Sequence, residues 1–357
     1  MPAKRLIALT QGDPAGIGPE VLAKFLLGRS PSASWVPLWV IERAALEPLR
    51  AVLPALDWER LRFVDRLPGR DEILAADGVV ALDPVGVARS LVPGTSTAAD
   101  AAGAVAALDA GLEAATSGLA DALVTAPVSK VSIARHHLPD FRGHTDYLAR
   151  RCGLEIYGRD YLMAFLAGSL QVALVTVHRP LVEAIGSLTV ETIHQAVACL
   201  GRHVEGRIAV AGLNPHAGEG GLLGSEEETA VAPAVEAALR DGLDVVGPES
   251  PDTVFARALD GVFDWVVALY HDQGLIAVKT AGFGGSVNWT VGLPVLRTSV
   301  DHGTAFDIAG RGVADELALA RTVATTVALL DGALPLAARR REGPSGGDGL
   351  ETDATGG

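Results

Sequence analysis

The chain has 357 residues, of which 49% are hydrophobic and 20% are charged, so it is long enough for two domains and can bury a large apolar core. Acidic side chains outnumber basic ones by 43 to 29, and the formal net charge of −14 excludes a general attraction to nucleic acid or to an anionic membrane surface. An anionic ligand must therefore be bound by a local cluster of basic side chains.

Hydropathy and cysteine usage predict a cytoplasmic protein. No apolar stretch approaches the roughly 20 residues that a membrane-spanning helix needs. The first residues, MPAKRLIALTQGDP, contain a hydrophobic run that is too short for a signal peptide. Cys152 and Cys199 form no disulfide or metal motif, which is typical of a reducing compartment.

Apolar runs typical of strands alternate with segments of helical period along almost the whole chain. The expected strands are 5–10, 39–42, 61–64, 79–82, 122–125, 162–167, 170–177, 208–213, 265–270 and 295–299. The expected helices are 19–27, 95–117, 190–203, 226–240, 252–259 and 314–330. This alternation predicts an α/β fold with a largely parallel sheet. The Gly-rich, polar residues 342–357 predict a disordered tail.

Three histidines share an unusual position, just beyond the carboxyl end of an apolar strand. His178 ends LQVALVTVH, His216 ends IAVAGLNPH and His271 ends WVVALYH. Ligands of open parallel sheets bind at that edge, and three imidazoles suit a divalent transition metal. The separations of 38 and 55 residues are too long for a local zinc motif, so histidines that only cap turns are the alternative.

A second group of side chains suits an anion. His144 and Thr145 lie in RGHTDYL, where Thr145 could cap a helix that begins at Asp146. Lys279 and Arg297 lie in apolar, strand-like runs, and a buried cation needs a partner. That partner is either a carboxylate of the protein or a bound phosphate or carboxylate. Asn288 completes the group.

Two glycine-rich loops could face a ligand. GDPAGIGPE connects the first expected strand to the first helix, but it is not the G-x-G-x-x-G dinucleotide fingerprint. DHGTAFDIAGRG contains small residues and the carboxylate of Asp307, which could hold an adenosine ribose. A loop that serves only in packing is the alternative for each.

Several motifs resemble the 4-hydroxythreonine-4-phosphate dehydrogenases of pyridoxal 5′-phosphate biosynthesis. They are GDPAGIGPE, TAPVSK, GHTDYL, NPHAGEGG, ALYHDQGLIAVK and the run GFGGSVNWTVGLPVLRTSVDHGTAFDIAGRG. The resemblance extends from about residue 5 to 330 and is most specific over 269–312. A fainter similarity links the two glycine-rich loops to the isocitrate and isopropylmalate dehydrogenases.

The resemblance implies two α/β/α domains, like those of isocitrate and isopropylmalate dehydrogenases, with the active site in the cleft between them. We expect a cofactor domain of residues 1–135 and 300–340, and a metal, substrate and dimerisation domain of residues 136–299. Residues that match the family's motifs imply three sets of roles. These are metal ligands His178, His216 and His271, substrate contacts His144, Thr145, Lys279, Asn288 and Arg297, and a cofactor loop with Gly303, Thr304 and Asp307.

The implied reaction is an oxidation by NAD or NADP with the help of zinc, magnesium or cobalt, in a homodimer whose metal site is shared between subunits. The C3 hydroxyl of 4-phosphooxy-L-threonine would become a ketone, and decarboxylation would yield 3-amino-2-oxopropyl phosphate. Asp272, next to His271, is either the proton acceptor or an orienting group.

Three alternatives to that reaction stay open. One is a related dehydrogenase of another four-carbon sugar-acid phosphate, such as threonate or erythronate 4-phosphate, because GHTD and FDIAG depart from the usual family motifs. A second is a non-catalytic protein that binds a metal and a phosphorylated ligand. A third is a metal hydrolase. The latter two leave the loop DHGTAFDIAGRG without a role.

Overall fold

The structure is a computed structural model that describes residues 4–282 and 285–332. Its helices are α1 Gly18–Leu27, α2 Arg43–Val52, α3 Arg70–Leu74, α4 Ala98–Thr116, α5 Lys130–His136, α6 His144–Arg151, α7 Leu181–Gly186, α8 Val190–Gly201, α9 Ala232–Arg240, α10 Val254–Leu259, α11 His271–Gly282 and α12 Leu317–Leu330. Its strands are β1 Arg5–Thr10, β2 Trp35–Val40, β3 Leu61–Val64, β4 Val79–Leu82, β5 Ala122–Thr125, β6 Leu162–Ala167, β7 Leu170–Leu174, β8 Ile208–Ala211, β9 Val245–Glu249, β10 Trp265–Ala268, β11 Val287–Val291 and β12 Leu296–Val300. The expected disordered tail, 342–357, lies outside the described residues.

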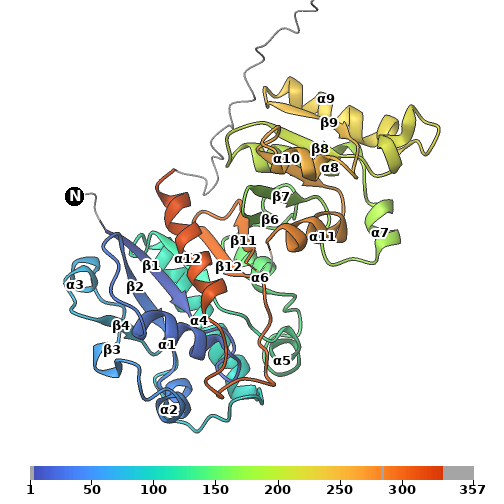
Figure 1. Cartoon of the computed structure of the whole chain (residues 1–357). Coiled ribbons are helices and arrows are strands. Elements are labelled where there is room, and N and C mark those ends of the chain that lie inside the picture. Colours follow the sequence, from blue (N-terminus) through green and yellow to red (C-terminus); the bar gives the residue numbers. More distant parts are fainter. Residues whose placement is uncertain (1–3, 283–284, 333–357) are drawn as a thin grey trace, which may run out of the picture.

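The strands form one sheet of twelve in the order β3-β4-β2-β1-β5-β12-β11-β6-β7-β10-β8-β9. Strands of the first half of the chain make up one end of this sheet, and strands of the second half make up the other (Figure 1). β12 crosses back and pairs in parallel with β5, so α12, which follows it, packs beside elements of the first half. The α/β class expected from the sequence is confirmed.

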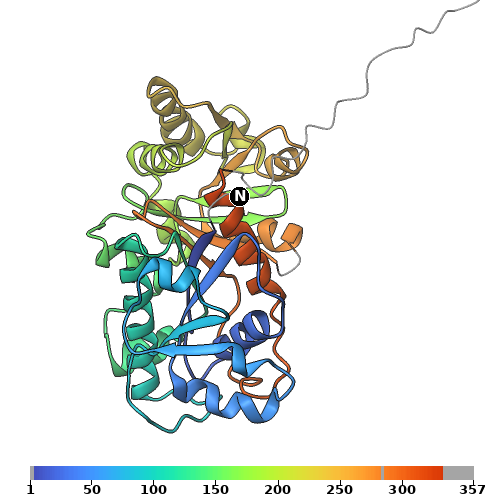
Figure 2. The same ribbon diagram turned by 90° about the vertical axis from the view of Figure 1, so that its left-hand side faces the viewer.

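The centre of the sheet is not parallel, unlike its two ends. β11 runs antiparallel to both β12 and β6, and β6 and β7 form an antiparallel hairpin. The sheet runs unbroken through the molecule, with α12 packed on β12 near the middle (Figure 2). The division into residues 1–135 with 300–340 and residues 136–299 remains a prediction, and β12 crosses its boundary at residue 300.

Four apolar layers cover the two faces of the sheet. In the first half, residues such as Leu9 and Trp39 pack under α1 and α2, and Leu123 packs on the opposite face. In the second half, Trp265 is fully buried beneath α8 and α9, and Val266 faces α10 and α11. Strands buried on both faces read as continuous apolar runs, which is why the sequence predicts most of them.

Two local expectations are wrong. Lys279 does not lie on a strand: residues 271–282 form α11, because apolar positions there recur at the spacing of a helix face, and Lys279 projects from the exposed side. Thr145 does not cap α6, since that helix begins one residue earlier at His144 with Gly143 as its N-cap.

Buried polar side chains tie the loops at the carboxyl edge of the first half together. The Glu42 carboxylate accepts hydrogen bonds from Gln11 Nε2 at 2.9 Å and from Arg89 Nε at 2.7 Å. Arg89 Nη1 also donates to Asp100 Oδ1 at 2.7 Å. Since Glu42 and Asp100 are each 1% exposed, Arg89 neutralises two carboxylates that water does not reach.

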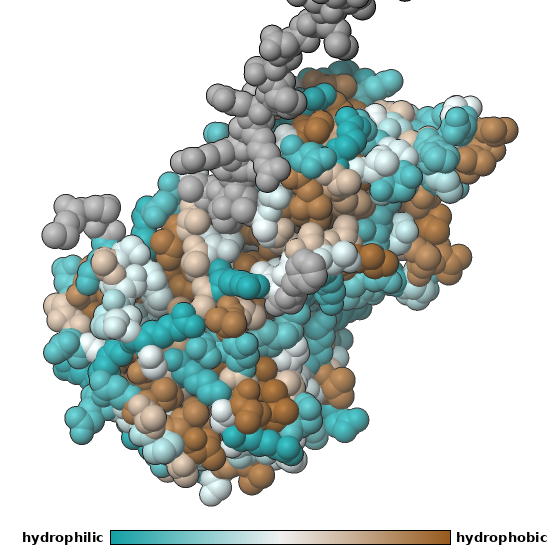
Figure 3. All heavy atoms as spheres, viewed as in Figure 1, coloured by the Kyte–Doolittle hydropathy of each residue, from teal (hydrophilic) through white to brown (hydrophobic). Residues whose placement is uncertain are grey.

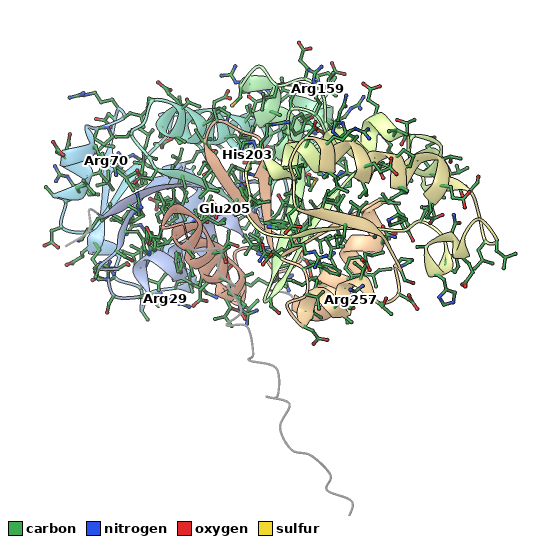
Figure 4. All side chains as sticks on the ribbon, turned by 90° about the horizontal axis from the view of Figure 1, so that it is seen from above. Arg29, Arg70, Arg159, His203, Glu205 and Arg257 are labelled. Carbon is green, nitrogen blue, oxygen red and sulfur yellow. The ribbon has the colours of Figure 1, made fainter. Side chains whose placement is uncertain are left out.

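Ion pairs at the periphery have a different character. Arg29 with Glu316, at 3.1 Å, and Arg70 with Asp121, at 2.7 Å, lie on the outside of the molecule, where Figure 4 labels both arginines. Water and salt weaken such partly exposed pairs. Arg89 is therefore the ion-pairing side chain that the loops of the first half depend on.

None of the described helices combines the length and apolarity needed to cross a membrane.

We expect Arg89→Met to lower the free energy of unfolding by about 3–5 kcal/mol, because it leaves two buried carboxylates without a counter-charge. Urea denaturation followed by circular dichroism measures this loss. The control is Arg207→Met, which removes an exposed arginine 3.9 Å from Asp244 and should change stability little. Equal effects of the two substitutions would contradict the role given to Arg89.

Candidate functional site

A cavity of about 220 Å³ collects most of the side chains that the sequence singles out. We call it the cation cavity. It lies where β12, β11, α6 and α11 meet, and its chemistry-bearing lining is Lys130, Arg142, His144, Thr145, Asp146, His178, His271, Lys279, Asn288, Arg297, Ser299, Asp301 and His302. All five expected substrate contacts and two of the three expected metal ligands line it.

Arg297 is the most unusual member of the cation cavity. It is the second residue of β12 and is 1% exposed. Its guanidinium donates to Thr125 Oγ1 at 2.6 Å and Thr290 Oγ1 at 2.9 Å, and at 3.4 Å to Asn288 Oδ1. Burial lowers the pKa of Arg297 to about 9, and no carboxylate of the described residues opposes this shift. A buried guanidinium held only by neutral groups keeps a positive charge that an anion could neutralise.

His144 lies beside that guanidinium at the start of α6. Its ring is hydrogen-bonded to the main chain of Ala126, and its Nε2 is buried without a partner among the described residues. Burial, followed by the charges of Arg297 and Lys130, lowers the pKa of His144 well below its usual value. Asn288, 5% exposed on β11, and Thr145, 9% exposed on α6, add neutral hydrogen-bonding groups, so the wall around Arg297 is polar without being acidic.

His178 and His271 form a pair on another wall of the cation cavity. Their ring centroids lie 5.4 Å apart, with the ring planes inclined by 45°. Burial, with the charges of Lys130 and His271, lowers the pKa of His178, which favours the neutral imidazole that binds metals. Asp272 Oδ1 lies 2.7 Å from His271 Nδ1 and orients that ring. Asp272 itself lines a different cavity, outside the cation cavity.

His216 does not join this pair within one chain. It follows β8, which neighbours β10 in the sheet, so all three histidines do follow adjacent strands as expected. However, the tight turn Pro215–Glu219 directs the chain away, and His216 lines a separate cavity of about 690 Å³ that includes Asp272. Among the described residues, no three His, Cys, Asp or Glu side chains are close enough to hold a metal ion.

The turn that carries His216 is strained and firmly anchored. His216 and Ala217 have φ angles of 52° and 51°, a left-handed conformation that costs a non-glycine residue about 1–3 kcal/mol. The buried Glu227 stabilises it by accepting hydrogen bonds from the backbone amides of Leu213 at 2.7 Å and Asn214 at 2.6 Å. The structure thus holds His216 rigidly in an exposed position.

The sequence analysis gave several lining residues no individual role, although Asp301 and His302 begin its expected cofactor loop, DHGTAFDIAGRG. Lys130, Arg142, Asp146, Asp301 and His302 all face the cation cavity. The available signal was position: Lys130 lies a few residues beyond β5, Asp146 follows Thr145 directly, and Asp301 with His302 follow β12. Asp146 accepts a hydrogen bond from Tyr161 Oη at 2.9 Å, and Asp301 accepts one from Ser286 Oγ at 2.6 Å.

The expected cofactor loop begins at the wall of the cation cavity with His302. Its Thr304 carbonyl accepts a hydrogen bond from the amide of Ile17 at 2.9 Å, so it packs on the first glycine-rich loop. A Cβ at Gly16 would lie 3.1 Å from the Thr304 carbonyl oxygen, and this glycine therefore permits the close approach. Asp307 is exposed, and the space beside Gly303 is open.

We expect inorganic phosphate to raise the melting temperature of the protein by binding at Arg297. Arg297→Lys and Arg297→Met should each raise the Kd for phosphate by about one to two powers of ten, because lysine keeps the charge but loses the planar fork. Titration calorimetry measures both. The unliganded Arg297→Met protein should unfold at no lower urea concentration than the wild type, because an unpaired buried charge is gone. Unchanged phosphate affinity in both variants would contradict this assignment.

Comparisons with known proteins place the chain. Residues 38–326 match the family described as pyridoxal phosphate biosynthetic protein PdxA. A 4-hydroxythreonine-4-phosphate dehydrogenase of Beijerinckia indica is 40% identical over 327 residues, covering 88% of this chain and 91% of the relative. A D-threonate 4-phosphate dehydrogenase of Salmonella typhimurium is also 40% identical, covering 89% and 97%.

A solved structure supports the same placement. The 4-hydroxythreonine-4-phosphate dehydrogenase of Klebsiella pneumoniae superposes with a TM-score of 0.80 at 36% identity, covering 92% of this chain and 100% of that one. With its fold, its family match and its relatives in agreement, the chain belongs to the PdxA family of dehydrogenases.

Proposed function

We propose that the protein oxidises the C3 hydroxyl of 4-phosphooxy-L-threonine with NAD or NADP, and that the resulting 3-keto acid loses carbon dioxide to yield 3-amino-2-oxopropyl phosphate. The observation that carries this proposal is the buried, carboxylate-free guanidinium of Arg297 beside a histidine pair. It provides an anion site and a candidate metal site in one cavity. The names of the relatives support the substrate and its place in pyridoxine biosynthesis.

In this proposal the cation cavity binds the anionic groups of the substrate. Arg297 binds one anionic group from the depth of the cavity, with Asn288 and Thr145 beside it. His144, neutral because of its lowered pKa, contributes a hydrogen bond through its otherwise unpartnered Nε2. Lys279 reaches in from the exposed side of α11. Charge-assisted hydrogen bonds to the anion overcome the long-range repulsion of a chain whose net charge is −14.

The donor set of the histidine pair fits a divalent metal, which we propose to be zinc, magnesium or cobalt. His178 favours the neutral form, and the hydrogen bond from His271 Nδ1 to Asp272 leaves the Nε2 lone pair of that ring free to bind. His178 and His271 would hold the ion together with His216 of a second copy of the chain. The bound ion would acidify the substrate hydroxyl and stabilise negative charge on its oxygen. We assign Asp272 the orienting role, because it faces away from the cation cavity.

We further propose a homodimer in which His216 of a second copy completes this site. His216 is exposed on a rigid, strained turn and is separated from the histidine pair of its own chain. Several large apolar side chains are exposed, and among them Leu222 and Val182 are each 78% exposed. Figure 3 shows apolar atoms gathered at the right-hand end, over α7 and the segment that follows the turn. Such a surface is typical of a protein contact.

Charge complementarity supports the same contact. A second cavity, of about 980 Å³, opens beside His178 and shares Lys130, Arg142 and Asp146 with the cation cavity. We call it the outer cavity. Arg150 and Arg179 make its lining basic. The segment around His216 carries the exposed Glu219 and Glu228, so an acidic turn of one copy meets a basic recess of the other.

The loop Gly303–Asp307 would bind the cofactor in this scheme. It is held against the first glycine-rich loop and starts at the cation cavity, so a nicotinamide bound there would lie near the substrate. Hydride transfer is the chemistry of the cofactor, and the protein's part is to hold C3 of the substrate in reach of it. The two cysteines are free and one of them, Cys199, is buried, as we expect of a cytoplasmic enzyme.

A related activity, oxidation of D-threonate 4-phosphate or erythronate 4-phosphate, is the second candidate. It is supported by the relative in Salmonella typhimurium, which is as similar to this chain as the 4-hydroxythreonine-4-phosphate dehydrogenases are. The test is an assay for reduced nicotinamide over all three four-carbon phosphates, each with NAD and NADP, in the presence of zinc, magnesium or cobalt. The proposal expects 4-phosphooxy-L-threonine to have the highest kcat/KM. A preference for either sugar acid would establish the second candidate instead.

The shared metal site predicts complementation between inactive variants. His178→Ala and His216→Ala should each lose most of the activity and should bind less metal per chain, with the fold intact. When the two variants are mixed in equal amounts after mild dissociation of their dimers, about a quarter of the wild-type activity should return. Half of the re-formed dimers then contain both variants, and each of these has one intact site of two. Turnover is measured before and after mixing. A mixture that stays inactive although mixed dimers form would contradict sharing.

The loop assignment predicts a selective effect on the cofactor. Asp307→Ala should raise the KM for NAD or NADP about tenfold or more and change the substrate KM little, because it removes a group that hydrogen-bonds only the cofactor. Initial rates over both concentrations separate the two constants. Asp315→Ala, a change at an exposed carboxylate further along the same segment, serves as the control. An increase in the substrate KM alone would show that the loop binds the other ligand.

A further inference from the structure

Lys130 is a cationic side chain that the binding scheme above does not use. It is the first residue of α5 and the one ammonium group that lines both the cation cavity and the outer cavity. Within the described residues it makes no ion pair and no hydrogen bond through Nζ, although the chain as a whole is rich in carboxylates. A lysine left without a partner at the junction of two cavities is available to a ligand.

The backbone around Lys130 positions it closely. Its stem runs over Gly143, where an added Cβ would lie 3.1 Å from Lys130 Cε and 3.5 Å from Nζ. Gly143 has a φ of 147°, which a residue with a side chain rarely adopts, so a glycine is required for this approach. The next residue is His144, and the Lys130 ammonium therefore lies beside the anion site.

A chain of hydrogen bonds fixes the first turn of α5. Ser129 caps the helix by accepting from the amide of Ser132 at 3.2 Å, and Ser132 Oγ lies 2.7 Å from Ser96 Oγ. Ser96 in turn donates to Asp13 Oδ2 at 2.8 Å, and Asp13 is fully buried at the end of β1. Lys130 thus projects from a turn that is anchored to the central sheet, not from a mobile loop.

Several other titratable groups of the cation cavity have partners within the protein. The carboxylate of Asp146 is held by the Tyr161 hydroxyl, and that of Asp301 by the Ser286 hydroxyl. His302 Nδ1 lies 3.1 Å from the carbonyl oxygen of Gly303. His178 and His271 are the proposed metal ligands. The positive charge of Lys130 contributes to the lowered pKa of both His144 and His178, so its ammonium lies near the anion site and near the histidine pair.

We propose that Lys130 is a catalytic residue, the proton donor that completes the decarboxylation; this inference rests on the proposed function. After a nicotinamide has accepted the hydride, the bond between the carboxylate carbon and C2 breaks, and its electron pair forms an enolate with the C3 ketone. The enolate carbon, C2, then takes a proton from Lys130: an N–H bond breaks, its electron pair stays on nitrogen, and a C–H bond forms. The neutral amine regains its proton from water, which reaches it through the outer cavity.

The test separates hydride transfer from protonation. In Lys130→Met the steady-state kcat should fall about 10²–10⁴-fold, the usual contribution of a general acid, whereas the substrate KM stays within a few-fold. Rapid mixing should show a burst of about one reduced nicotinamide per site at the wild-type rate, followed by slow turnover, because the enolate accumulates. A residue that only supports the fold would slow both phases together.

Matched variants separate the proton from the charge. Lys130→Arg keeps a cation at the junction but cannot give up a proton, so it should show the same burst and the same slow turnover. Lys279→Met removes the other lysine of the cavity and should raise the substrate KM without producing a burst. Lys130→Cys, prepared with Cys152→Ser and alkylated with 2-bromoethylamine, restores an amine and should recover turnover; Cys199 is fully buried and stays unreactive.

Three results would overturn the inference. They are a Lys130→Met enzyme that turns over within about threefold of the wild type, a burst phase slowed as much as the steady state, and a Lys130→Arg enzyme of nearly full activity. If the wild type reduces no nicotinamide with any of the three four-carbon phosphates, the proposed function itself fails and takes this inference with it. The wild-type assay therefore tells the two failures apart.

Discussion

The organisation of the site depends on one buried guanidinium. Arg297 lies on β12, between β5 and β11, at the place where the two halves of the chain share a sheet. Its hydrogen bonds to Thr125 on β5 and Thr290 on β11 join a strand of the first half to a strand of the second. Burying this charge among hydroxyl groups alone costs free energy, which is visible in its lowered pKa. An anion bound at this guanidinium would offset the cost.

That charge also resolves a conflict between the chain and its ligand. An acidic protein repels a phosphorylated acid at a distance, and exposed lysines and arginines paired with carboxylates offer it little. In the cation cavity the basic groups are arranged differently: Arg297 has no carboxylate partner, and Asp146 and Asp301 are each held by a hydroxyl group. A concentrated positive field is thus kept inside a molecule of net negative charge.

Outside the cavity, buried carboxylates hold loops in place. Glu42 and Asp100 organise the loops of the first half through Arg89, and Glu227 shapes the turn that presents His216. In each case a carboxylate shielded from water accepts several hydrogen bonds, which makes a loop without regular structure rigid. Rigid loops suit a site that has to align reacting groups.

The sequence by itself determined the α/β class and most of the strands, and it predicted two groups of candidate site residues. Strands buried on both faces read as apolar runs, and the histidines at their ends mark one edge of the sheet, since local pattern and strand direction suffice for both inferences. Only the tertiary structure decided that β11 and β6 run antiparallel in the centre, because pairing depends on contacts between distant segments. It also decided that residues 271–282 form a helix with Lys279 on its exposed side, since a short apolar run fits either period. Finally, it separated His216 from His178 and His271, because the direction of a turn is not encoded in residue spacing. It also brought Lys130 to the cavity of the histidine pair, because residue spacing does not encode how one helix approaches another.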